Sequence, residues 1–296
     1  MKSGFVSLIG RPNVGKSTLL NAIIGKKIAI TSNTAQTTRN MIQGIYNDEN
    51  SQIIFVDTPG IHKPKHKLGT ILNEQAYYSM NDVDVVLFLV SASEKFGTGD
   101  KFILDKLKDI DVPVILVLNK IDKIRYEDIL PLIDEYKNYY SFAEIVPVSA
   151  LNKKNIDDLI KTISKYLEDD IKYYDDSTIT NVSDTFIISE LIREKVLNLT
   201  HEEVPHSVTC VIDLIEEDKN KVVINASLIV DRENLKKILI GSHGSMIKKI
   251  GMEARSDIEE FLQKKVYLDL RVKVISDWRD KDSFLNRELG FKDFNE

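Results

Sequence analysis

Short, wholly apolar runs alternate with segments of helical spacing through the first half of the chain. Such runs suit buried strands, whereas apolar residues that recur every three to four positions indicate helices with one buried face. Strands are predicted at residues 5–9, 51–56, 83–90, 112–118 and 144–148, and helices at 18–24, 101–107 and 156–163. This alternation predicts an α/β fold with a mostly parallel sheet flanked by helices, and a ligand at the carboxyl ends of the strands.

A different order of elements follows residue 167. Residues 168–180 are polar and acidic without a period, which predicts a linker. Beyond it the pattern predicts a helix at 184–199, strands at 207–215 and 222–230 around a turn at 216–220, helices from 234 and from 245, and a strand at 266–276. We therefore expect a first domain over residues 1–167, a linker over 168–182, and an α+β domain with a C-terminal helix over 183–296.

The loop after the first predicted strand fits the pattern G-x-x-x-x-G-K-[ST] without a departure. Glycines at its two ends let the backbone wrap around phosphate oxygens, and the N–H groups of the loop and of the next helix point at the anion. Lys16 is expected to reach the β- and γ-phosphates, and Ser17 to ligate the Mg²⁺ that bridges them. The predicted triphosphate site comprises Gly10, Arg11, Pro12, Asn13, Val14, Gly15, Lys16, Ser17 and Thr18.

Two further segments are expected to sense the γ-phosphate. The polar residues 31–40 predict a mobile loop, in which Thr38 ligates Mg²⁺ and Thr37 is the near alternative. The strand at 51–56 leads into D-T-P-G, where Asp57 would hold a Mg²⁺-bound water and the Gly60 N–H would contact the γ-phosphate. The predicted metal ligands are Ser17, Thr38 and Asp57, the predicted catalytic residues are Lys16, Thr38 and Gly60, and Thr58, Pro59 and Ile61 complete the nucleotide contacts of this turn.

Ile61 stands where Ras-type GTPases carry the glutamine that orients the attacking water. An aliphatic side chain cannot orient water, so slow intrinsic hydrolysis is expected. Residues 61–72, with two histidines and three lysines, predict a second mobile loop whose histidines are exposed rather than catalytic.

The strand at 112–118 ends in N-K-x-D, a motif that selects guanine. The Asp122 carboxylate can accept from both N1–H and the 2-amino group, and Asn119 can contact the purine edge. Adenine offers no such donor pair, and an unpaired carboxylate costs about 1–3 kcal/mol, so ATP is disfavoured. The S-A-L loop after the strand at 144–148 is expected to contact the guanine carbonyl. The predicted base site comprises Asn119, Lys120, Ile121, Asp122, Ser149, Ala150 and Leu151.

Composition changes this picture little. The chain has 296 residues, is 43% hydrophobic and carries a formal net charge of −6. No apolar run is long enough to cross a bilayer and no signal-peptide pattern is present, so a cytoplasmic location is expected. The single cysteine, Cys210, excludes an intramolecular disulfide and is expected to be a core residue of a strand.

The two central helices of the second domain are joined by a G-x-x-G turn at residues 241–244. In the order α-β-β-α-α-β, this turn resembles the loop with which KH domains clamp single-stranded RNA. Ile240, Ile247 and Ile250 would form the floor under the bases, and four lysines would supply local positive charge. A helix-turn-helix core element is the alternative, and His243 is equally an RNA contact or a solvated residue. The predicted RNA-binding residues are Lys237, Ile240, Gly241, Ser242, His243, Gly244, Ile247, Lys248 and Lys249.

Together these motifs resemble the Era family of bacterial GTPases. The resemblance rests on G-R-P-N-V-G-K-S-T-L-L-N, A-Q-T-T-R, D-T-P-G-I-H, N-K-I-D, V-S-A-L and I-L-I-G-S-H-G-S-M-I-K-K-I-G, and covers nearly every residue. It implies binding of GTP or GDP with Mg²⁺, capture of the 3′ end of 16S rRNA, a role in maturation of the small (30S) ribosomal subunit, and peripheral association with the inner face of the membrane. It also implies that RNA stimulates hydrolysis, and that K⁺ near Asn13 can replace an arginine finger.

Two functional classes follow from these features. One is an RNA-responsive GTPase switch, which the KH-like domain favours. The other is a membrane-associated cell-cycle signalling GTPase that binds RNA incidentally, although no lipidation site or basic amphipathic helix is evident. An ATPase that remodels RNA is opposed by N-K-x-D. A monomer is expected.

Overall fold

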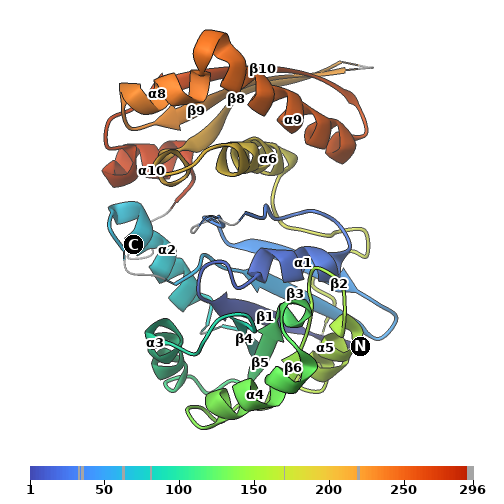
Figure 1. Cartoon of the computed structure of the whole chain (residues 1–296). Coiled ribbons are helices and arrows are strands. Elements are labelled where there is room, and N and C mark those ends of the chain that lie inside the picture. The colour runs from blue at the N-terminus through green and yellow to red at the C-terminus, as the bar shows by residue number, and fades with distance from the viewer. Residues whose placement is uncertain are drawn as a thin grey trace. The chain divides into compact units, whose positions relative to one another are not determined.

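The computed structural model describes residues 1–32, 34, 37–61, 64–80, 82–169, 171–218 and 221–291. These fall into two compact units, which are described separately (Figure 1). The N-terminal unit comprises Met1–Thr31, Thr38–Pro64 and Leu72–Asn181, and the C-terminal unit comprises Ser32–Thr37, Lys65–Ile71 and Val182–Glu296.

The N-terminal unit is built on one sheet in the order β2-β3-β1-β4-β5-β6, with β7 paired to β1. Its strands are β1 (Lys2–Gly10), β2 (Ile42–Asn47), β3 (Ser51–Asp57), β4 (Val85–Ser91), β5 (Val114–Asn119), β6 (Glu144–Pro147) and β7 (Glu168–Asp169). All pairs are parallel except β2 with β3 and β7 with β1. The mostly parallel sheet is therefore confirmed, and the carboxyl ends of β1, β3, β4, β5 and β6 meet along one edge.

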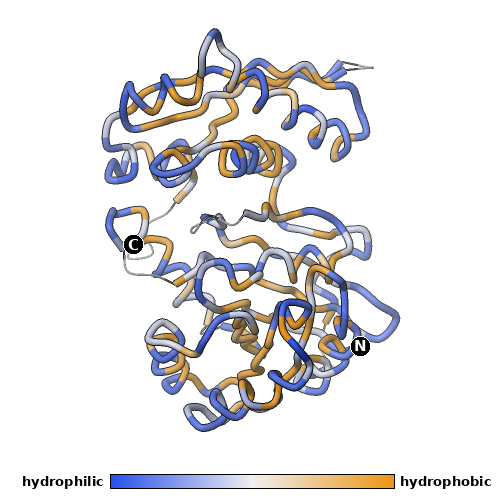
Figure 2. The backbone as a smooth tube through the Cα atoms, viewed as in Figure 1, coloured by the Kyte–Doolittle hydropathy of each residue, from blue (hydrophilic) through white to orange (hydrophobic). Residues whose placement is uncertain are grey.

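Helices cover this sheet as the alternating pattern predicts. They are α1 (Lys16–Ile24), α2 (Lys67–Tyr78), α3 (Thr98–Leu107), α4 (Ile129–Lys137) and α5 (Ile156–Ser164), with the short turns η1 (Ile121–Lys123) and η2 (Tyr126–Asp128). The hydropathy colouring in Figure 2 places apolar residues on the central strands, and every residue of β4 is buried.

Two elements differ from the sequence prediction. The loop expected over residues 61–72 gives way to helix α2 from Lys67, because Leu68, Ile71, Leu72 and Ala76 share one buried face at helical spacing. His62 and Lys63 of that expected loop lie outside the described residues. Strand β2 was not predicted, because it is short and its buried residues, Ile42, Gly44 and Ile45, form neither an apolar run nor a regular alternation.

The segment expected as a linker, 168–182, is attached to the N-terminal unit up to Asn181. The Gln52 side chain accepts hydrogen bonds from the Tyr173 and Tyr174 N–H groups at 2.7 and 2.9 Å, and donates to the Tyr174 carbonyl at 2.8 Å. The Thr180 hydroxyl donates to the Gln43 carbonyl at 2.7 Å. The polar composition of residues 168–182 did not predict this attachment, because backbone groups, the Thr180 hydroxyl and the buried Gln52 amide of β3 make these bonds.

The C-terminal unit has a three-stranded sheet in the order β10-β9-β8, with β8 and β9 antiparallel and β9 and β10 parallel. Its elements are α6 (Asp184–Leu199), α7 (Val204–Ser207), β8 (Thr209–Asp218), β9 (Lys221–Val230), α8 (Glu233–Ile240), η3 (Ser242–Gly244), α9 (Ser245–Leu262), β10 (Lys265–Val274), η4 (Trp278–Asp280) and α10 (Asp282–Glu288). The expected order α-β-β-α-α-β is confirmed. Strand β8 runs three residues further than predicted, through 216–218.

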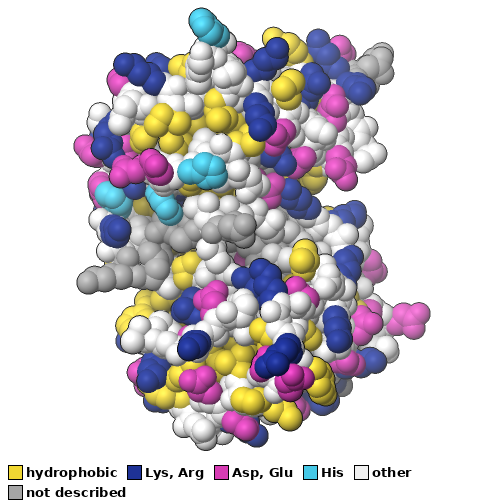
Figure 3. All heavy atoms as spheres, viewed as in Figure 1, with side chains coloured by type: hydrophobic (Ala, Val, Ile, Leu, Met, Phe, Trp, Pro, Cys, Tyr) yellow, Lys and Arg dark blue, Asp and Glu magenta, His cyan; other side chains and the backbone are white. Residues whose placement is uncertain are grey.

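On the face drawn in Figure 3, acidic and basic side chains of the described residues are interspersed in both units. This agrees with the small net charge of −6. Within the described part of the chain, none of the helices has the length and apolar content needed to span a bilayer.

Candidate nucleotide site and RNA groove

The phosphate-binding loop connects β1 to α1 at the carboxyl edge of the sheet. Gly15 has φ +100° and Asn13 has φ +64°, so the loop curls before Lys16 begins the helix. At Gly10 a Cβ atom would lie 2.4 Å from the Leu89 carbonyl oxygen, which only glycine avoids. Val14 is fully buried and anchors the loop, and Thr18 follows in the first turn of α1. The residues of the motif are thus assembled for an anion.

The Lys16 side chain lies inside this loop. Its Nζ donates to the carbonyl oxygens of Gly10 and Arg11, each at 3.2 Å, and the residue is 6% exposed. Burial lowers the pKa of Lys16 to about 8, and the nearby Asp57 carboxylate opposes that shift. A cation that burial destabilises in this way gains from an incoming polyphosphate.

Three side-chain oxygens converge beside Lys16. The Ser17 hydroxyl donates to Asp57 Oδ2 at 2.6 Å and lies 2.8 Å from the Thr38 hydroxyl, which is 3.4 Å from the same carboxylate oxygen. Asp57 Oδ1 is buried without a hydrogen-bond partner. Burial raises the pKa of Asp57, against the opposing effects of Lys16 and the two hydroxyls. Hard oxygen donors and an orphaned buried carboxylate oxygen fit Mg²⁺.

The same geometry separates the two threonines that the sequence left open. Thr38 is buried against Ser17, whereas the Thr37 hydroxyl donates to the Thr34 carbonyl at 2.6 Å. Only Thr38 joins the oxygen cluster. Ala35 and Gln36, in the A-Q-T-T-R motif, lie outside the described residues.

The D-T-P-G turn packs against the phosphate-binding loop. The Thr58 hydroxyl donates to the Leu8 carbonyl at 2.7 Å, which fixes the turn beside β1. A Cβ atom on Gly60 would stand 2.9 Å from the Pro12 nitrogen, so this close approach requires glycine. Pro59, between Thr58 and Gly60 in the sequence, is buried. Ile61 is 5% exposed and packs in an apolar cluster with Phe88, so it does not face the phosphate loop as a water-orienting group would.

The residues predicted to select the base form a second cluster at the ends of β5 and β6. Asn119 is 2% exposed; its Nδ2 donates to the Val14 carbonyl at 2.9 Å, and its Oδ1 accepts from the N–H groups of Lys120 and Ala150 at 2.8 and 3.1 Å. Its side chain therefore joins three loops rather than facing an open purine site. Lys120 Nζ donates to the Asn13 carbonyl.

The edge of the base site is more open. Asp122 is exposed and accepts a hydrogen bond from the Ser149 hydroxyl, which holds the carboxylate in place. Ile121 is half-buried, and Leu151 is 72% exposed at the rim.

Arg11 has partners that the sequence did not indicate. Its Nε donates to Asp100 Oδ1 at 2.9 Å, and its Nη2 donates to Glu94 Oε2 at 2.8 Å. The guanidinium therefore points at the N-terminus of α3, and only its backbone carbonyl meets Lys16. No local motif could have paired residues so distant in the chain.

The G-x-x-G turn joins α8 to α9 in the C-terminal unit. Gly241 has φ +72°, and a Cβ atom there would lie 2.8 Å from Met246 Cβ, so this position requires glycine. Gly244 also has positive φ, at +77°. Ser242, His243, Lys237, Lys248 and Lys249 are exposed on and around the turn, so a phosphate has free access to these groups.

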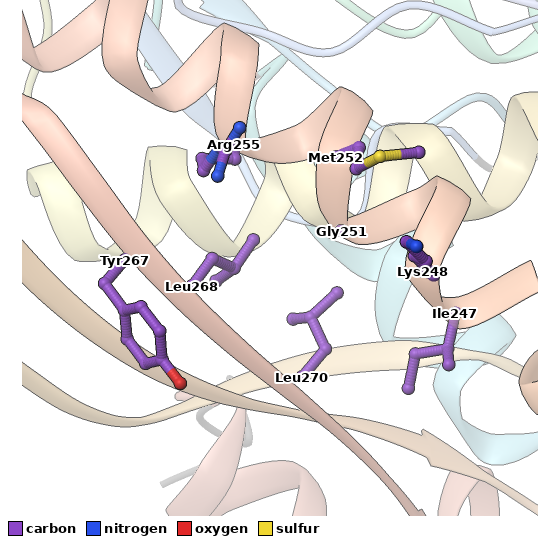
Figure 4. A pocket seen from close by; sticks show the side chains of 8 residues that line it. All are labelled: Ile247, Lys248, Gly251, Met252, Arg255, Tyr267, Leu268 and Leu270. Atoms are coloured by element: carbon purple, nitrogen blue, oxygen red, sulfur yellow. The ribbon is translucent and has the colours of Figure 1, made fainter. Parts of the chain in front are cut away.

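A groove of about 300 Å³ continues from this turn between α9 and β10. It is lined by Ile247, Lys248, Gly251, Met252, Arg255, Tyr267, Leu268 and Leu270 (Figure 4). The prediction that Ile250 belongs to the floor under the bases is wrong, because its side chain is fully buried in the core. Ile240 is half-buried at the end of α8 and is not among the lining residues.

Sequence analysis missed six of these lining residues. Gly251, Met252 and Arg255 follow Ile247 and Lys248 at a spacing of four, so the helical period could have placed them on one face. Tyr267, Leu268 and Leu270 come from β10, and only the fold brings that strand opposite α9.

Comparisons with known proteins agree with the fold predicted for each half of the chain. The family model described as "50S ribosome-binding GTPase" matches residues 5–120, and the model described as "KH domain" matches residues 203–279. A solved tyrosine-to-alanine variant of Aquifex aeolicus Era, bound to GDP and AlF4⁻, is 44% identical, with 97% of this chain and 98% of that chain covered and a TM-score of 0.93. A structure of Era with MgGDPNP and nucleotides 1506–1542 of 16S ribosomal RNA has the same identity and coverage, with a TM-score of 0.94.

Proposed function

This chain belongs to the Era family of GTPases, and from that premise we propose that it is a GTP-hydrolysing switch that binds the 3′ end of 16S rRNA and assists maturation of the small ribosomal subunit. The observation that carries the proposal is its similarity, over 97% of its length, to an Era structure that holds such an RNA fragment. The α9–β10 groove, which continues from the G-x-x-G turn, supports it independently.

GTP hydrolysis transfers the γ-phosphoryl group to water. Lys16 and the amides of residues 10–17 stabilise the charge that develops on the β–γ bridge oxygen and the γ-phosphate. The buried position of Lys16 supports this role, because a charge in a low-dielectric site interacts strongly. Gly60 and Thr38 report the presence of the γ-phosphate to the segments that follow them.

Ser17, Thr38 and Asp57 hold Mg²⁺ in this proposal. The chemistry supplied by the bound ion is neutralisation of charge on the β- and γ-phosphate oxygens. Asp57 orients the site through its hydrogen bond from Ser17, at 2.6 Å. Loss of the γ-phosphate releases Thr38, whose hydroxyl contacts the Ser17 hydroxyl and the Asp57 carboxylate through side-chain atoms.

The burial of Ile61 means that water positioning comes from elsewhere. Asn13 is exposed in the phosphate loop and carries an amide oxygen, which is a hard ligand suited to an alkali cation. K⁺ beside the phosphates is therefore part of the proposal. Single-turnover rates in matched KCl and NaCl buffers test it, and equal rates would remove K⁺ from the mechanism.

RNA binding is assigned to the turn and groove of the C-terminal unit. The amides around Gly241 and Gly244, with Lys237, Lys248 and Lys249, meet the phosphate backbone, and the groove receives bases. Strand β10 lies at the edge of the three-stranded sheet, so one side of its backbone faces no other strand of the described chain. Base edges can form hydrogen bonds with the backbone N–H and C=O groups on that side of β10.

The decisive experiment is single-turnover GTP hydrolysis by the full chain, with and without a single-stranded RNA that matches the 3′ end of 16S rRNA. Acceleration by this RNA but not by a scrambled RNA of the same composition supports the switch. Tight binding without acceleration assigns the trigger to a ribosomal protein, and absence of binding refutes the RNA role.

Location belongs to the same proposal. We infer that the protein is cytoplasmic and associates peripherally with the inner face of the membrane. Cell fractionation with a high-salt wash tests it: a peripheral protein leaves the membrane pellet on washing. A membrane-dependent change in GTPase rate without any RNA effect would instead favour the alternative of a cell-cycle signalling GTPase.

A further inference from the structure

Gly251 occupies an unusual place in α9. The helix runs over Ser245–Leu262, and Gly251 lies well inside it, between the fully buried Ile250 and the 52%-exposed Met252. Glycine in a helix interior is less favourable than alanine, because its backbone loses more freedom on folding. A structural or functional reason is therefore needed for glycine at this position.

The packing of the unit supplies no structural reason. A Cβ atom on Gly251 would meet only Leu270 Cδ1, at 3.5 Å, which is an ordinary van der Waals contact, and the φ of Gly251 is not in the left-handed region. Gly241 is the contrast: there the backbone has φ +72° and a Cβ atom would lie 2.8 Å from the Met246 backbone nitrogen. Glycine is required for the fold at 241 but not at 251.

The groove supplies a functional reason. Ile247, Gly251 and Arg255 succeed one another on the face of α9 that lines the groove, and Leu270 of β10 lies opposite. Figure 4 shows Ile247 and Tyr267 toward opposite ends, with Leu268 and Leu270 between them. A methyl group at 251 would project toward Leu270 and narrow the groove midway along its length.

We propose that Gly251 forms the seat of a nucleobase in the groove. A flat ring of single-stranded RNA rests against the exposed helix backbone at Gly251 and the side chain of Leu270. Lys248 lies on the side nearer the G-x-x-G turn, and Arg255 with Tyr267 lies on the other, where cationic and aromatic side chains favour stacked bases. This inference rests on the RNA-binding function proposed above and specifies how one position of the groove is read.

The test substitutes Gly251→Ala in the full chain. Because the methyl group fits the fold, the C-terminal unit should become more stable, with a rise in melting temperature of about 4 °C. Because it raises the floor of the seat, affinity for a fluorescein-labelled RNA matching the 16S 3′ end should fall about tenfold. Trp278, the only tryptophan and fully buried in the C-terminal unit, reports the melting by its fluorescence.

Ser256→Ala is the matched control. Ser256 is exposed on the same helix and does not line the groove, so its substitution raises helix propensity without changing the seat. This variant should melt higher and bind RNA as the wild type does. Basal GTP hydrolysis should be unchanged in Ser256→Ala.

A series of RNAs, each lacking the base at one position, identifies the base that occupies the seat. At one position, the abasic RNA should bind wild type and Gly251→Ala equally, because no ring remains to meet the methyl group. Equal affinity of both proteins for intact RNA, or a lower melting temperature of Gly251→Ala, would overturn the inference. Failure of the wild type to bind intact RNA would instead refute the proposed function.

Discussion

The Arg11 guanidinium donates to the carboxylate of Asp100 at 2.9 Å, and Asp100 is 1% exposed. This bond ties the second residue of the phosphate-binding loop to the first turn of α3, where the same carboxylate accepts from the Gly97 N–H at 3.0 Å. Burial raises the pKa of Asp100, and Arg11 opposes that shift. The loop is thus held in shape from outside the nucleotide site.

We expect Arg11→Ala to release GDP faster, by about tenfold, because the loop loses this anchor. The variant should also destabilise the N-terminal unit by about 2–3 kcal/mol, since a buried carboxylate loses its partner. Stopped-flow release of a fluorescent GDP analogue measures the first effect, and urea unfolding followed by circular dichroism measures the second.

Glu94→Gln serves as the control for Arg11. Glu94 is 40% exposed, so loss of its ion pair should cost less than about 1 kcal/mol. In the double variant Arg11→Ala/Asp100→Asn, the cost should be smaller than the sum of the single ones. Unchanged GDP release in Arg11→Ala would show that the anchor has no part in nucleotide binding.

Ile61→Gln should not install a catalytic glutamine. The side chain at this position points into the apolar cluster that includes Phe88, so an amide there would be buried without partners, at a cost of about 1–3 kcal/mol. We expect lower stability and no gain in single-turnover GTP hydrolysis. Ile61→Val, which keeps the site apolar, should change stability by about 1 kcal/mol. A tenfold faster reaction in Ile61→Gln would mean that the segment turns outward in the GTP state.

Asp122→Asn should change the preferred base from guanine to xanthine. The carboxylate accepts from two donors of guanine, whereas an amide presents one acceptor and one donor, which match xanthine. Loss of the second pairing and the unfavourable N–H contact should weaken GTP binding about 100-fold. Competition of GTP and XTP against a fluorescent GDP analogue measures the ratio, and an unchanged preference would remove Asp122 from base selection.

Cys210 should be unreactive in the native chain. It is 6% exposed in the C-terminal core, and burial, assisted by Glu190, raises the pKa of its thiol. A raised pKa keeps the thiol protonated at pH 8, and the thiolate is the reactive form. A disulfide reagent such as Ellman's should therefore titrate no thiol in native buffer and one per chain in urea. Rapid native labelling would indicate frequent opening of the C-terminal unit.

Those parts of this protein whose chemistry lies in contiguous residues could be predicted from the sequence. The phosphate loop around Lys16, the turn at Asp57, N-K-x-D and G-x-x-G each need fixed residue types at fixed spacing, so they can be identified before any fold is known. Long buried strands such as β4 were equally clear, because residues 85–90 form an unbroken apolar run.

The relationships between distant segments became visible in the fold. It joined Arg11 to Asp100, brought Thr38 rather than Thr37 to Ser17, turned Ile61 into the core, and set β10 opposite Gly251. Each of these depends on which elements pack together, and packing is set by the summed burial of many side chains. The spacing of residues within one segment does not identify the distant residues that pack against it, because those contacts depend on the whole fold.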